Sequence, residues 1–229
     1  MKAKSPRRLP PPPRPAPRTN PELLTSPPPA RDARLRVLML CAPGREAQSF
    51  AALTALERQN PGWPIWVYRS PLRRPITEFW RMLAPHRGSD VLALEDDITS
   101  VRGFFDYVAD LWRSPHVTSF FHVNRPILGV PVSARIFSYC QAVKLPAAIL
   151  GRLLDTSPPP HGGGQDDDLG MRLEILREPV VYHRSLVQHL GAVSLAWHGM
   201  PLDGREARDF PGEDFDLAQL FPITEKGSP

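Results

Sequence analysis

Cysteine is scarce in this chain, and long apolar runs are missing. The 229 residues include two cysteines, Cys41 and Cys140, which are too few for a disulfide framework or a cysteine-rich zinc site. No stretch approaches the roughly 18 consecutive apolar residues that a membrane helix needs. No apolar stretch follows the positively charged start, as it would in a secretory signal. These absences predict a protein without a transmembrane segment in a reducing, cytoplasmic setting.

Several motifs of common enzyme classes are missing as well. There is no G-x-G-x-x-G after the first predicted strand, which argues against a dinucleotide-binding domain. There is no G-x-x-x-x-G-K-[ST], which excludes a P-loop NTPase, and no G-x-S-x-G nucleophile elbow. The seven histidines show no H-E-x-x-H spacing, which argues against a zinc hydrolase. Any catalytic chemistry must therefore come from other residues.

Proline and positive charge are concentrated at the start of the chain. Eleven of the 29 prolines lie in the first 29 residues, and residues 1–36 hold nine Lys or Arg against two acids. Subtracting these from the 28 basic and 24 acidic residues of the whole chain leaves 19 and 22, a net charge of −3. Residues 1–33 are therefore predicted to form a disordered, solvated leader. A basic arm can also contact nucleic acid or anionic lipid, but nucleic acid is not the expected partner.

Short apolar runs alternate with helical periodicity from residue 34 onward. The apolar runs predict strands over residues 35–40, 65–68, 91–94, 117–123, 137–143 and 180–182. Helical spacing predicts helices over residues 50–56, 76–83, 104–112, 146–154 and 166–176. This alternation implies parallel crossovers, so we expect an α/β domain over 34–199 with helices on both faces of a mostly parallel sheet. Residues 200–229 are expected to form an irregular, acidic lid or tail.

Three consecutive carboxylates, Glu95, Asp96 and Asp97, follow the third predicted strand. Open α/β sheets bind ligands at the carboxyl ends of their parallel strands. Carboxylates packed together repel one another unless a cation neutralises them. Mg²⁺ and Mn²⁺ prefer oxygen ligands and accept a phosphate-bearing substrate alongside them. The triplet therefore indicates a divalent-cation site, although a charged strand end that caps the next turn is an alternative explanation.

Two further groups of residues are candidates for chemistry. Asp166, Asp167 and Asp168 open the last predicted helix after a glycine-rich loop. One Asp in a first turn is ordinary capping, but three exceed that need, so one is a candidate general base toward a hydroxyl. His189 is flanked by apolar and small residues. A hydrogen-bonded core histidine is the commoner role, yet this imidazole can complete the coordination shell of the same cation.

Taken in order, these segments resemble the GT-A-type nucleotide-sugar glycosyltransferases and are most similar to the N-acetylglucosaminyltransferase IV family. The similarity spans about residues 35–198. It is carried by Pro43–Glu46 with Ser49–Leu56, by Leu94–Ile98, and by Ser185–Gly191 with Ser194–Leu195 beyond it. In addition, residues 165–173 match the GT-A pattern E-D-x-D-L-x-x-R-L, except that Gln165 replaces the first acid.

The resemblance implies a GT-A (Rossmann-like) fold and a metal-dependent sugar transfer with inversion. The implied donor is a UDP-sugar, with UDP-GlcNAc as one candidate, and the implied acceptor is a hydroxyl of a glycan or another molecule. The resemblance assigns Mn²⁺ or Mg²⁺ to Asp97 and His189. It places Glu95, Asp96 and Arg45 in contact with the nucleotide sugar. It makes Asp166 the general base, with Asp167 and Asp168 as rivals.

Two other functions stay open from the sequence. A metal-dependent nucleotidyltransferase also places carboxylates at strand ends around a phosphate-bound cation, and Pro43-Gly44-Arg45 is a short version of its basic first loop. A non-catalytic binding module is the second, because prolines 10–13 of the leader can recruit SH3-like domains.

Overall fold

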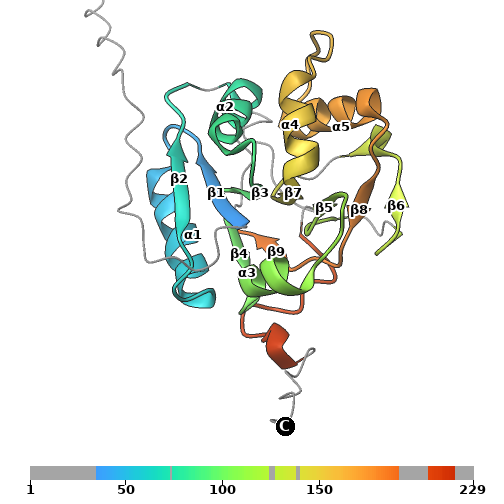
Figure 1. The fold of residues 1–229 in the computed structure, drawn as a ribbon. Helices are drawn as coiled ribbons and strands as arrows, with labels where there is room; N and C mark the ends of the chain where they lie inside the picture. Colours follow the sequence, from blue (N-terminus) through green and yellow to red (C-terminus); the bar gives the residue numbers. More distant parts are fainter. Residues whose placement is uncertain (1–34, 73, 124–126, 138–139, 191–205, 220–229) are drawn as a thin grey trace, which may run out of the picture.

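The computed structural model describes residues 35–72, 74–123, 127–137, 140–190 and 206–219 (Figure 1). Its strands are β1 (Leu35–Cys41), β2 (Ile65–Arg69), β3 (Asp90–Glu95), β4 (Ile98–Ser100), β5 (Val117–Ser119), β6 (Pro131–Val132), β7 (Ala142–Leu145), β8 (Val180–Tyr182) and β9 (Val187–His189). Its helices are α1 (Glu46–Gln59), α2 (Pro75–Leu83), α3 (Phe104–Asp106), α4 (Ala147–Asp155) and α5 (Gln165–Leu176). Its short helical turns are η1 (Ala84–His86), η2 (Tyr107–Leu111), η3 (Ala134–Ile136) and η4 (Leu217–Gln219). The predicted leader, residues 1–33, lies outside the described residues.

The main sheet has seven strands in the order β2-β1-β3-β7-β5-β8-β6, and β4 pairs with β9 in a separate two-stranded sheet. Strands β2, β1, β3, β5 and β8 run in one direction, whereas β7 and β6 run in the other. The expected α/β class with a mixed, mostly parallel sheet is therefore confirmed. Strand β7 lies antiparallel between β3 and β5, and the chain reaches it from β5 through β6 and η3, without the helical crossover that parallel neighbours usually have.

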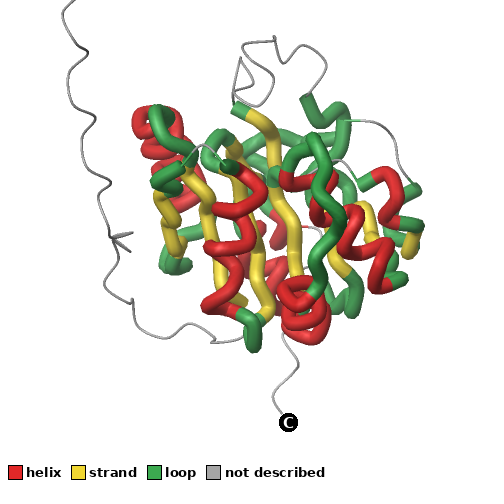
Figure 2. Tube along the Cα trace, turned by 90° about the horizontal axis from the view of Figure 1, so that it is seen from above, coloured by secondary structure: helices red, strands yellow, loops and turns green. Residues whose placement is uncertain are grey.

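Helices cover both faces of the main sheet, as predicted (Figures 1 and 2). Alternate residues of β1 divide between two apolar clusters: Val37 and Met39 pack toward α1, α3 and the β4–β9 sheet, and Leu38 packs toward α2, α4 and α5. Residues 91–94 of β3 are buried on both faces in the same way. A central strand covered on both sides explains the continuous apolar runs of β1 and β3.

The carboxyl ends of β1 and β3 lie at a switch in strand order. From β1 the chain passes through α1 to β2, which lies on one side of β1 in the sheet. From β2 it passes through α2 to β3, which lies on the other side of β1. Helices α1 and α2 lie on opposite faces of the sheet. Open α/β sheets bind ligands in the crevice that such a switch creates. The loop after β1 and the acidic residues after β3 meet at this point.

Where the structure differs from the predicted elements, the segments are short or irregular. β5 ends at Ser119 rather than at residue 123, and the strand expected within 137–143 is β7, at Ala142–Leu145. Strands β4, β6 and β9 have two or three residues each and lack the apolar run that identified the equally short β8. The helix predicted over 104–112 ends in a π-helical turn, and the buried Lys144 donates to the carbonyl oxygen of Trp112 there (3.0 Å).

The described part of the C-terminal region, residues 206–219, is irregular except for η4. It nevertheless belongs to the folded unit, because Ala207 and Leu217 are buried in the cluster beneath α1. Arg102, just before α3, holds it through two backbone hydrogen bonds, to Phe215 (3.0 Å) and from Leu217 (3.2 Å). Within the described ranges, no helix has both the length and the hydropathy of a membrane-spanning segment.

Candidate functional site

The register of the small β4–β9 sheet brings His189 to the acidic end of β3. The chain turns at Asp96–Asp97 between β3 and β4, and Ile98 then pairs with His189 of β9. The backbone N–H of Leu190 donates to the carbonyl oxygen of Asp97 (2.6 Å). Two segments about ninety residues apart in the sequence are therefore held together by main-chain hydrogen bonds.

Glu95, Asp97 and His189 form a cluster in which one ligand atom from each lies within 4.8 Å of the others. His189 Nε2 is 3.1 Å from Asp97 Oδ2. The predicted meeting of Asp97 and His189 is confirmed as geometry, and their role as metal ligands stays a prediction. The other carboxylate oxygen, Asp97 Oδ1, is buried and has no hydrogen-bond partner among the described residues. A buried carboxylate oxygen without a partner is costly, and a bound cation would offset that cost. The two carboxylates and the imidazole are also ligands that a divalent metal accepts.

Arg45 supplies positive charge to the same carboxylates. It follows Gly44, whose φ of 81° turns the loop after β1. Its guanidinium pairs with Asp96 Oδ1 (3.2 Å) and with Asp97 Oδ2, and its Nε donates to Gln48 (3.0 Å). The Arg45 side chain is nine-tenths buried in this position. Arg45 thus compensates the charge of the acidic triplet, and its predicted contact with donor phosphate stays a prediction.

Asp96 turns away from the cluster and anchors the β1–α1 loop. Its Oδ2 accepts hydrogen bonds from the backbone N–H of Ala42 (2.9 Å) and from the hydroxyl of Ser49 (3.0 Å). With Arg45 on Oδ1, both carboxylate oxygens already have protein donors. The structure thus gives Asp96 a positioning function in the loop, which the sequence did not indicate.

Burial and neighbouring charges shift the proton affinities of the cluster. Burial, together with the charge of Asp97, raises the pKa of Glu95 to about 8. Burial lowers the pKa of His189, but the hydrogen bond and charge of Asp97 outweigh it and leave that pKa above its usual 6.5. Burial raises the pKa of Asp97, but His189 and Arg45 overcome it and hold that pKa below 3.8. Without a metal, Asp97 is thus the ionised carboxylate of the cluster at neutral pH.

The contact of Gln165 with Glu95 explains why an amide stands where the GT-A pattern has a glutamate. The side-chain amide of Gln165 donates to Glu95 Oε1 (2.6 Å). A glutamate in its place would set another carboxylate against Glu95 and Asp97, and like charges at that distance repel. The amide instead stabilises the carboxyl group of Glu95 and ties the start of α5 to the end of β3.

The three aspartates of α5 have separate environments. Asp167 is exposed and accepts a hydrogen bond from the backbone N–H of Gly164 (2.9 Å), which is ordinary capping. Asp168 is buried and accepts from Trp80 Nε1 (2.6 Å) and Arg172 Nε (2.6 Å). Asp166 is partly exposed and lies close enough to Glu95 for its charge to raise the pKa of that group. Its Oδ1 also accepts the backbone N–H of Asp167 (3.2 Å), so Asp166 both contributes to the helix start and acts on Glu95 through its charge.

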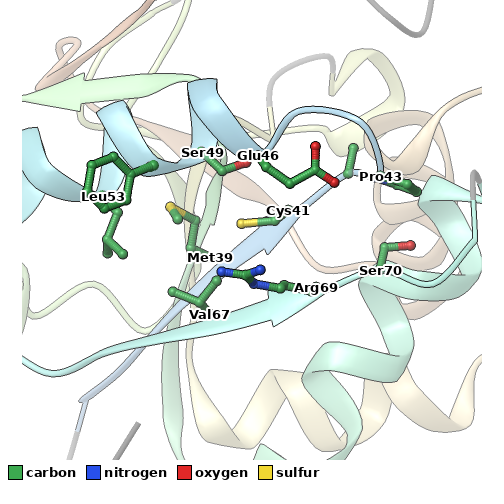
Figure 3. A pocket seen from close by; sticks show the side chains of 11 residues that line it. Met39, Cys41, Pro43, Glu46, Ser49, Leu53, Val67, Arg69 and Ser70 are labelled. Atoms are coloured by element: carbon green, nitrogen blue, oxygen red, sulfur yellow. The ribbon is translucent and has the colours of Figure 1, made fainter. Parts of the chain in front are cut away.

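A groove borders the site between the carboxyl ends of β1 and β2 and the first turns of α1 (Figure 3). Its volume is about 140 Å³. Its lining includes Cys41, Ser49, Phe50 and Arg69. Phe50 is 71% exposed, which is unusual for an aromatic side chain and leaves its ring available to a ligand. Ser49 connects the groove to the cluster, because it also bonds to Asp96.

Neither cysteine is suited to act as a nucleophile. Burial raises the pKa of the Cys41 thiol to about 11 and places that of Cys140 well above its usual value. Both thiols therefore stay protonated at neutral pH, and the thiolate is the reactive form.

The affinity of the cluster for a divalent cation is expected to rise with pH. Glu95 and His189 both have raised pKa values, so both hold protons at low pH and must release them to coordinate a metal. Mn²⁺ affinity should increase by about tenfold per pH unit for each proton released, and level off above about pH 8. Isothermal titration with Mn²⁺ across this range measures it. Glu95→Gln should bind more weakly with a shallower pH dependence, whereas an affinity that falls as pH rises would contradict the assignment.

Asp168→Asn is expected to lower the free energy of unfolding by about 2–3 kcal/mol at neutral pH. The loss comes from weakening charged hydrogen bonds in a buried site. Burial raises the pKa of Asp168, but the hydrogen bonds from Arg172, His161 and Trp80 lower it below 3.8 overall. This stabilisation is present above 3.8 and is lost as pH falls further, so the two proteins should converge in acid. Urea unfolding measures the difference. The exposed Asp167→Asn is the matched control, with a loss of at most about 1 kcal/mol.

Comparison with known proteins adds no family to this geometry. No protein-family model matches the chain, and no curated protein matches it. The functional assignment therefore depends on the arrangement of Arg45, Glu95, Asp97, Asp166 and His189 at the end of β3.

Proposed function

We propose that this protein is a metal-dependent glycosyltransferase of the GT-A type, which moves a sugar from a nucleotide sugar to an acceptor hydroxyl. The observation that carries the proposal is the cluster of Glu95, Asp97 and His189 at the switch point of the sheet, with one buried carboxylate oxygen left without a partner among the described residues. The groove beside it and the nearby Asp166 supply the two further parts that such a reaction needs.

Asp97 and His189 would hold Mn²⁺ or Mg²⁺, and Glu95 lies close enough to contribute a third ligand. When bound, the cation acts as a Lewis acid that offsets the charge developing on the leaving diphosphate. Arg45 adds a positive charge at the same place, and a guanidinium binds phosphate oxygens as readily as carboxylates. We propose that Arg45 contacts the donor diphosphate from its position beside Asp96 and Asp97.

The groove is the proposed binding site of the donor nucleoside. Phe50 offers an exposed ring for stacking, and Arg69 and Ser49 offer polar contacts. A nucleoside there would have its phosphates directed along the β1–α1 loop toward the cluster, because Ser49 and Ala42 lie between them and bond to Asp96. A uridine diphosphate sugar is the donor class that we propose, as the family resemblance implies.

Asp166 is the proposed general base. It would take the proton of the acceptor hydroxyl while that oxygen forms its bond to the anomeric carbon. The bond from that carbon to the diphosphate breaks, and its electron pair leaves with the diphosphate. One displacement of this kind inverts the anomeric centre. The closeness of Asp166 to Glu95 favours it for the role, whereas Asp167 is exposed at the cap of Gly164 and Asp168 is buried against Trp80 and Arg172.

The active-site assignment predicts that Asp97→Ala and Asp166→Asn each reduce sugar transfer by at least about 100-fold without unfolding the protein. Asp97→Ala should also abolish stabilisation by Mn²⁺, whereas Asp166→Asn should retain it. Asp155→Asn is the control, because Asp155 pairs with Arg87 at an exposed position away from the site. Normal turnover by purified Asp97→Ala would exclude the metal assignment.

A thermal-shift screen of nucleotide sugars, with and without Mn²⁺, tests the donor class. We expect stabilisation by a UDP-sugar when the metal is present and little without it, because ligand binding to the folded state raises its stability.

Product analysis then separates sugar transfer from nucleotidyl transfer, since the first releases UDP and the second pyrophosphate. If the protein is an enzyme, deleting residues 1–33 should leave sugar transfer unchanged. If it is instead a non-catalytic binding module recruited through its prolines, the deletion should abolish binding of its partner.

A further inference from the structure

The C-terminal segment, residues 206–219, is bonded to the strand that carries His189. The contact runs through the side chain of Gln188, the central residue of β9. Its Oε1 accepts the backbone N–H of Ala207 (3.0 Å), and its Nε2 donates to the Ala207 carbonyl (3.4 Å). The same Oε1 accepts the backbone N–H of His189 (3.0 Å). A single amide therefore joins the main chain at His189 to the main chain of the C-terminal segment.

A second tether lies at the start of β9. Asp209 Oδ2 accepts the backbone N–H of Ser185 (3.2 Å) and lies 3.3 Å from His122 Nε2. The backbone carbonyl of Asp209 accepts from Arg184 (3.3 Å). Ser185 is fully buried and precedes β9 by two residues. The C-terminal segment therefore fixes the direction in which the chain enters β9.

The segment can act as a support because it is itself anchored in the core. Ala207 and Leu217 are 5% and 4% exposed. Glu213 accepts hydrogen bonds from Arg58 (3.0 Å) and Gln59 (3.2 Å) at the end of α1. By contrast, β9 pairs with β4 over only three residues, and a two-stranded pairing of that length is weak by itself.

We propose that Gln188 is a positioning residue for the metal centre, and that the C-terminal segment is through it a structural part of that centre. Gln188 and Ala207 hold the backbone of His189 so that its imidazole stays against Asp97. The inference deepens the proposed function, because it rests on His189 being a metal ligand. Mutation of a residue that orients a metal ligand typically lowers metal affinity by about 10–100-fold.

The test is a double-mutant cycle between Gln188 and His189, read out as Mn²⁺ affinity by isothermal titration. Gln188→Met keeps the size of the side chain and removes both the donor and the acceptor. It should weaken Mn²⁺ binding by about 10-fold or more. In a His189→Ala background, Gln188→Met should cause no further loss, because it acts through that imidazole. Asp209→Ala, which cuts the second tether, should behave in the same way.

Ile149→Val is the control for a loss of stability alone. Ile149 is buried in α4 on the opposite face of the sheet, so its truncation lowers the melting temperature without touching β9. It should leave Mn²⁺ affinity unchanged. The proposal would be overturned if Ile149→Val lost as much Mn²⁺ affinity as Gln188→Met, or if Gln188→Met left the affinity unchanged. It would also be overturned if Gln188→Met weakened Mn²⁺ binding equally in the wild-type and His189→Ala backgrounds.

A measurement without metal separates this inference from the proposed function. The ¹⁵N resonances of the His189 imidazole report its hydrogen bond to Asp97, and they should change in Gln188→Met but not in Ile149→Val. If the wild-type protein binds no Mn²⁺, the proposed metal role fails, and these resonances still decide whether Gln188 positions His189. Unchanged resonances in Gln188→Met would refute the positioning role.

Discussion

The structure depends on how negative charge is compensated where β3 ends. Three carboxylates leave the same buried strand, and their mutual repulsion would oppose folding unless positive or donor groups surrounded them. Arg45 pairs with two of them, His189 approaches Asp97, and Gln165 donates to Glu95. These partners come from the β1–α1 loop, from β9 and from α5. One electrostatic requirement therefore draws three distant segments to one point.

The fold places this point where a ligand can use it. The order of β2, β1 and β3 puts the ends of two parallel strands beside a crevice, and the helices on opposite faces leave that end open. Arg45 lies in the loop that borders the groove, so the same loop faces both the acidic cluster and the space proposed for the donor. Charge compensation and the proposed ligand binding would then use one set of side chains, as is typical of functional sites with perturbed pKa values.

Neighbouring residues of the same type have different functions here because their environments differ. Within the acidic triplet, Asp96 anchors a loop, while Glu95 and Asp97 face the cluster. On α5, Asp167 caps the helix, Asp168 is buried in a hydrogen-bond network, and Asp166 bonds to the first turn and lies near Glu95. The C-terminal segment, which is irregular apart from η4, also has a defined place in the fold, because Ala207 bonds to Gln188 of β9.

The sequence by itself determined the α/β class, most of the longer helices and strands, and the pairing of Asp97 with His189 through a family resemblance. These features follow from local apolar periodicity and from short motifs, which a single chain displays directly. Only the tertiary structure decided the antiparallel entry of β7, the three short strands and the partners of Arg45, Asp96 and Asp168. Each of these depends on contacts between residues far apart in the chain. The missed strands also lack an apolar run, so neither the strands nor their partners can be recognised from local sequence.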